Sequence, residues 1–125
     1  MISDKLRKAV VKQFGGARAF KAAAPEVCQH GIGGGFAGFI CYSDTTAFFA
    51  KNKADILFLA KYHAEESGQS MLEMIHDFRC LGGELSIDEI AEGIYTTGGD
   101  VRVANALAWF AAEEVCREYC DKTGQ

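Results

Sequence analysis

Cysteine and histidine residues in two parts of the chain have spacings that suit a metal ion. Cys28 and His30 are separated by one residue, and Cys116 and Cys120 are four residues apart. On a helix, two thiolates at that spacing face the same way and can bind zinc. The common C-x2-C and H-x3-H pairs are absent, and the cysteine count of five is odd. We therefore expect free, mostly buried thiols, and no metal or cofactor.

Nucleophilic catalysis needs a cysteine or serine beside a histidine that an acidic or amide side chain orients. The chain has three histidines, His30, His63 and His76, but no G-x-S-x-G turn. His63 and His76 fall in expected helices, where a structural hydrogen bond is their commoner fate. We predict that the protein is not an enzyme.

The glycine-rich segment 31–38 matches G-x-G-x-x-G between Gly33 and Gly38. A dinucleotide-binding loop needs a strand before it and a helix directly after it, whereas here the expected strand follows. Nucleotide binding is therefore disfavoured. One alternative stays open: a small ligand-binding site or enzyme in the loop from Cys28 to Tyr42, with His30, Tyr42 and Asp44 as its polar groups.

Charge is distributed unevenly along the chain, whose net charge is −4. Residues 1–25 carry six basic side chains and one acidic, or +5, whereas residues 26–125 carry seven basic and sixteen acidic, or −9. A domain that mainly binds DNA is normally basic overall, and the aromatic-rich segment 36–49 has no interleaved lysine or arginine. We therefore do not expect direct nucleic-acid binding, and assign these aromatics to the core or to a protein-binding patch.

Neighbouring carboxylates such as Glu113 and Glu114 diverge by about 100° on a helix, so such a pair does not converge on a substrate. Most of them are expected to lie on solvated faces. On the last helix, Glu113, Glu114 and Glu118 are our candidates for contacting the basic surface of a partner protein.

Apolar spacing and capping residues predict six or seven helices in one mostly α-helical domain, residues 1–125. Residues 1–25 form a basic helical segment packed on residues 26–120. Pro25 is expected to stop the second helix, and residues 36–42 to form a short strand, paired with 27–31 in a hairpin. The expected helices cover residues 3–14, 17–24, 43–52, 52–67, 69–81, 86–95 and 100–120, with Ser3, Asn52, Ser86 and Asp100 as N-terminal caps.

Three segments resemble an uncharacterised family of small phage and prophage proteins. The first two are residues 30–49, H-G-I-G-G-G-F-A-G-F-I-C-Y-S-D-T-T-A-F-F, and residues 70–78, S-M-L-E-M-I-H-D-F. The third is residues 105–115, N-A-L-A-W-F-A-A-E-E-V. Together they extend the resemblance over roughly residues 28–118.

The resemblance implies a mobile-element context and no particular reaction. Small acidic phage proteins often bind a host protein complex, with anti-CRISPR proteins as the best-known case. The resemblance therefore predicts a non-enzymatic accessory protein that inhibits or redirects a host protein complex through an acidic surface. A CRISPR–Cas component is one example of such a target. A self-assembling role, with a homodimer, stays open. No apolar run is long enough to span a bilayer and no signal peptide is evident, so we expect a cytoplasmic location in a bacterial host.

Overall fold

Six α-helices form the fold in the computed structural model, which describes residues 1–32, 39, 42–78, 85–95 and 99–124. No strand occurs within these ranges. The helices are α1 (Asp4–Gln13), α2 (Ala17–His30), α3 (Tyr42–Ser67), α4 (Met71–Phe78), α5 (Ile87–Tyr95) and α6 (Val101–Thr123).

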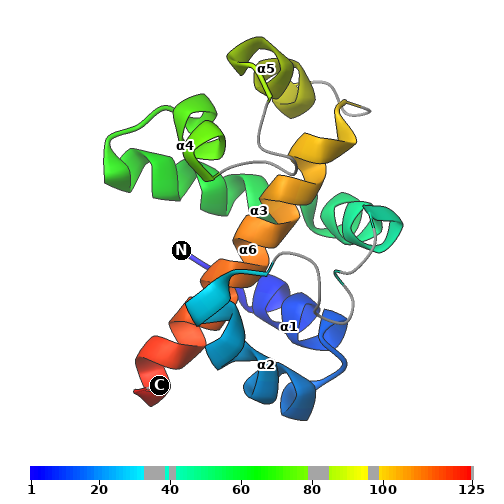
Figure 1. Cartoon of the computed structure of the whole chain (residues 1–125), viewed down its shortest axis with the longest axis vertical. Coiled ribbons are helices and arrows are strands. Elements are labelled where there is room, and N and C mark those ends of the chain that lie inside the picture. Colours follow the sequence, from blue (N-terminus) through cyan, green and yellow to red (C-terminus); the bar gives the residue numbers. More distant parts are fainter. Residues whose placement is uncertain (33–38, 40–41, 79–84, 96–98, 125) are drawn as a thin grey trace.

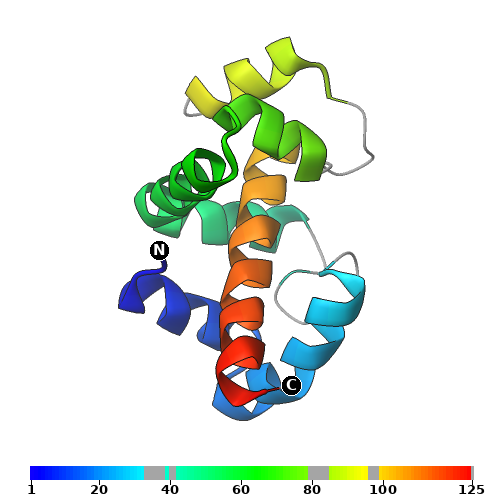
Figure 2. The same cartoon turned by 90° about the vertical axis from the view of Figure 1, so that its left-hand side faces the viewer.

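The long C-terminal helix α6 is the centre of the molecule, and each of the other five helices packs against it. In Figures 1 and 2, α1 and α2 surround its C-terminal half, α4 and α5 lie toward its N-terminal end, and α3 crosses between them. The buried face of α6 includes Leu107, Phe110 and Val115. The result is a single compact helical domain, as the sequence predicts.

Local capping chemistry sets where several helices begin. The Ser3 hydroxyl accepts a hydrogen bond from the backbone N–H of Leu6 at 3.1 Å, and Asp100 accepts one from Arg102 at 2.9 Å. Ser86 and Glu89 form the expected capping box, each side chain accepting from the other's backbone N–H. These predicted N-termini are confirmed.

Helix α3 is interrupted at Asn52, where the backbone leaves helical geometry (φ −120°, ψ 18°). The buried Asn52 amide donates from Nδ2 to the carbonyl of Phe48 at 3.0 Å, a bond back to the preceding turn. The predicted restart of the helix at Asn52 is confirmed, whereas the Asn52 side chain bonds backward to the preceding turn and not forward as the predicted N-terminal cap. Gly68, with φ +73°, follows the end of the helix.

Pro25 does not end α2, so the predicted stop at this residue is wrong. Helix α2 continues to His30, and residues 27–30 are helical where one arm of a hairpin was expected. Ala24 and Val27 are buried on the side of α2 that packs on the rest of the domain. The free energy gained by burying these side chains outweighs the loss of the one backbone hydrogen bond that proline removes.

The predicted strand at residues 36–42 falls mostly outside the described residues, as does the glycine motif at 33–38. Tyr42 is already helical. The aromatics Phe39 and Phe48 are buried, with ring centroids 5.3 Å apart, and so belong to the core. In the described part of the chain, no helix is long and apolar enough to cross a membrane.

Candidate functional site

The three candidate carboxylates of α6 all make contacts within the fold. Glu118 accepts two hydrogen bonds from the Arg7 guanidinium, at 2.6 Å from Nε and 2.9 Å from Nη2. The Arg7 hydrogen bond, followed by the Arg7 charge, lowers the pKa of Glu118 despite partial burial. This pair ties α1 to the C-terminal end of α6, so Glu118 has a structural role.

Glu113 and Glu114 face different neighbours, as their divergence on a helix predicts. Glu113 accepts a hydrogen bond from the backbone N–H of Ile32 at 3.2 Å, just after the end of α2. Burial raises its pKa. Glu114 pairs with Arg117 on the next turn of α6 and lies 3.9 Å from His63 Nδ1. The three carboxylates do not form one solvated acidic surface.

The residues of the alternative loop site lie on two helices, α2 and α3. His30 is exposed in the last turn of α2, with its Nε2 3.9 Å from Oε2 of Glu26. Tyr42 is the first residue of α3. Asp44 lies in the first turn of α3, is exposed, and lines a pocket that does not include His30.

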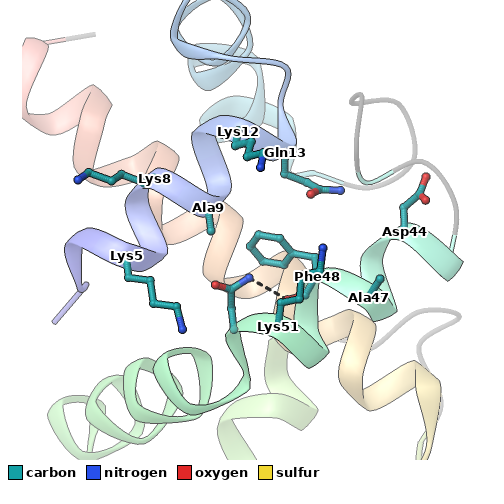
Figure 3. Close-up of a pocket in the computed structure, with 10 residues that line it drawn as sticks. Lys5, Lys8, Ala9, Lys12, Gln13, Asp44, Ala47, Phe48 and Lys51 are labelled. Atoms are coloured by element: carbon teal, nitrogen blue, oxygen red, sulfur yellow. Dashed lines mark hydrogen bonds between the residues drawn. The ribbon is translucent and has the colours of Figure 1, made fainter.

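That pocket lies between α1 and α3 and has a volume of about 550 Å³ (Figure 3). Four lysines contribute to its lining, three from α1 and one from α3: Lys5, Lys8, Lys12 and Lys51. Gln13, Asp44 and Asn52 add polar groups, while Ala9, Ala47 and Phe48 complete the wall. We call this the lysine pocket.

The lysine pocket follows from the register of α1. Leu6 and Val10 are fully buried against the domain, whereas Lys5, Lys8 and Lys12 are exposed on the remaining surface of the helix. In Figure 3, Lys5 extends from α1 toward α3, whereas Lys8 points away from the gap between the helices. Packing of α1 on α3 then brings Lys51 to the same pocket.

The lining of the lysine pocket carries four positive charges and one negative charge. Within the described part of the chain, none of the four lysines forms an ion pair, in contrast with Lys122, which lies 3.7 Å from Glu118. Asp44 supplies the one carboxylate among the lining residues. The basic N-terminal segment is visible in the sequence, but its proximity to Lys51 is not, because that proximity depends on the packing of α1 on α3.

The fold brings together three of the cysteines considered as metal ligands. The Sγ atoms of Cys28 and Cys120 are 3.2 Å apart, and Cys116 lies one turn before Cys120 on α6. Among the described residues, however, no group of three or more histidine, cysteine, aspartate or glutamate side chains is arranged to hold a metal ion.

Comparison with protein families gives one assignment. The model of a family described as a domain of unknown function (DUF7222) matches residues 3–125. The chain belongs to this family. No curated protein matches the chain, and no solved structure matches it. The family description names no activity or source, so the resemblance to phage proteins and the anti-CRISPR role stay predictions.

Proposed function

We propose that the chain is a non-enzymatic binding protein whose lysine pocket holds an acidic segment of a partner protein. The observation that carries this proposal is a pocket between α1 and α3 whose lining includes four lysines and a single carboxylate. Binding to another protein is retained from the sequence-based prediction, but the surface changes from the carboxylates of α6 to the lysines. The resemblance implies a host protein complex as the source of the partner.

The chemistry of the pocket favours carboxylates on a short segment. Lysine ammonium groups are compact point charges on flexible stems, and they pair with carboxylates without the fixed fork geometry of arginine. A long nucleic acid would also run past the rest of the chain, where residues 26–125 carry a formal charge of −9. That charge repels an extended polyanion more than a short peptide confined to the pocket.

Binding of a fluorescein-labelled oligoglutamate peptide, followed by fluorescence anisotropy at low salt, tests the proposal. The triple variant K5Q/K12Q/K51Q is expected to weaken binding roughly tenfold or more, since each exposed ion pair contributes up to about 1 kcal/mol. Added salt should weaken wild-type binding, because the lysines are exposed to solvent.

The matched control is R18Q/K21Q/K61Q, which removes the same number of positive charges from exposed side chains outside the lysine pocket. We expect this variant to keep its peptide affinity within about threefold of wild type. Charges outside the pocket act on the peptide only at long range, where salt screens them. Equal losses in the two triple variants would refute a specific site. Tighter binding of an oligothymidylate of the same length would overturn the choice of an acidic protein segment.

A further inference from the structure

The C-terminal ends of α2 and α6 bring two thiols into direct contact. Cys28, in the last turn of α2, donates an S–H hydrogen bond to Sγ of Cys120, near the end of α6, at 3.2 Å. Cys28 is exposed, whereas Cys120 is buried. A disulfide has an S–S length of about 2.05 Å, so the two sulfurs must approach each other by roughly 1 Å to bond.

We propose that Cys28 and Cys120 form an intramolecular disulfide when the reduced chain meets a low-molecular-weight disulfide such as oxidised glutathione. The proposal is independent of the lysine pocket, since neither cysteine lines that pocket. The crosslink would join positions 92 residues apart in sequence and fix the end of α2 on α6.

The exposure of the two thiols sets the order of the reaction. The Cys28 thiolate attacks one sulfur of oxidised glutathione, which forms a mixed disulfide and releases one glutathione as its thiolate. The Cys120 thiolate then attacks the Cys28 sulfur, so that the Cys28–Cys120 bond forms and the bond to glutathione breaks. Two protein thiols are oxidised, one oxidised glutathione is reduced to two glutathiones, and the two protons pass to the departing thiolates.

The pKa values of the thiols make this oxidation slow at neutral pH. Partial burial of the sulfur, in a residue that is exposed as a whole, followed by contact with Cys120, raises the pKa of Cys28 to about 11. At pH values below this pKa, each increase of one pH unit is expected to raise the thiolate fraction of Cys28 about tenfold, and the initial rate with it. Burial raises the pKa of Cys116 further, to about 12, which disfavours it as the first thiol to react.

Incubating the reduced full-length chain with oxidised glutathione at mildly alkaline pH, followed by alkylation, trypsin digestion and mass spectrometry, tests the proposal. Trypsin cleaves after Arg117, which places Cys116 and Cys120 on separate peptides. Cys28 shares its tryptic peptide with Cys41, so the C41S variant is digested in parallel to assign the crosslink. We expect a Cys28–Cys120 crosslink in both proteins, and a melting temperature raised on the order of 10 °C by loop closure.

Three serine variants separate the roles of the cysteines. C120S is expected to stop at the mixed disulfide and retain one glutathione on Cys28, while C28S should lose the crosslink. C116S should form the crosslink at the wild-type rate within about twofold. A Cys28–Cys116 crosslink in the wild type would overturn the proposal, as would a wild-type chain that stays at the glutathione adduct.

Discussion

At the scale of single residues, the carboxylates of α6 differ in whether folding favours their charge. The fold stabilises the charge on Glu118 through Arg7, and disfavours the charge on Glu113 through burial. The sequence identifies these side chains as acidic residues of a helix. It does not identify their partners, because Arg7 is 111 residues from Glu118, and Ile32 is 81 residues from Glu113.

The E113Q variant is expected to be more stable than wild type at pH 7. A folded-state pKa raised above the reference of 4.5 means that ionised Glu113 costs stability as pH rises through the folded value. Glutamine removes that charge and keeps an oxygen that can accept from the Ile32 N–H. Thermal unfolding should show a melting temperature higher by on the order of 2 °C at pH 7, with the gain disappearing below the reference pKa.

The matched control is E118Q, which also removes one negative charge from α6 but loses the charge-assisted bonds to Arg7. In the wild type the pKa of Glu118 is lowered. The stability that its charge contributes is therefore present above the reference pKa of 4.5 and is lost as pH falls through the folded-state pKa. We expect E118Q to be destabilised by about 1 kcal/mol at pH 7. If both variants shifted the melting temperature in the same direction, net charge would account for the effect and the assigned partners would not.

At the scale of helices, features set by neighbouring residues are predicted well, and features set by distant packing are not. Ser3 and Asp100 act within a few residues of themselves, so their types and spacing are enough to place a helix boundary. Pro25 shows the opposite case. Its cost is local, but the burial of Val27 that offsets it depends on the rest of the domain.

Close contact between α5 and α6 at Gly93 gives a prediction at this scale. A Cβ atom on Gly93 would lie 2.7 Å from Cγ2 and 2.8 Å from Cβ of Val103. Overpacking of this kind costs about 1–3 kcal/mol, which exceeds the gain of up to about 1 kcal/mol in helix propensity. We expect G93A to lower the midpoint of urea unfolding.

The V103A background supplies the control for this contact. Removing the two Cγ atoms of Val103 takes away the contacts at 2.7 Å and 3.3 Å but leaves Cβ at 2.8 Å. V103A therefore relieves part of the clash, and adding G93A to V103A should cost somewhat less than adding it to wild type. An unchanged cost would show that the contact with the Val103 methyl groups is not the source of the strain. A rise in stability of G93A itself would mean that helix propensity outweighs packing at this position.

At the scale of the whole molecule, the lysine pocket and the central position of α6 both arise from tertiary packing. The spacing of Lys5, Lys8 and Lys12 is visible in the sequence, together with the uneven charge of the chain. The contribution of Lys51 is not visible, because residues 14–50 separate it from α1 and no local pattern connects the two helices. A charge pattern therefore predicts which segment is basic, while the fold decides where that charge is concentrated.

The packing of every other helix on α6 predicts that the chain unfolds in one cooperative step. Trp109, the chain's one tryptophan, lies half-buried in α6 and reports on this central helix, whereas far-UV circular dichroism reports on all helices. Urea unfolding followed by both signals should give the same midpoint and slope. If α4 and α5 separated from the domain first, circular dichroism would change at lower urea than Trp109 fluorescence. Coincident curves would instead mean that losing the contacts of any one helix weakens α6 enough to unfold the rest.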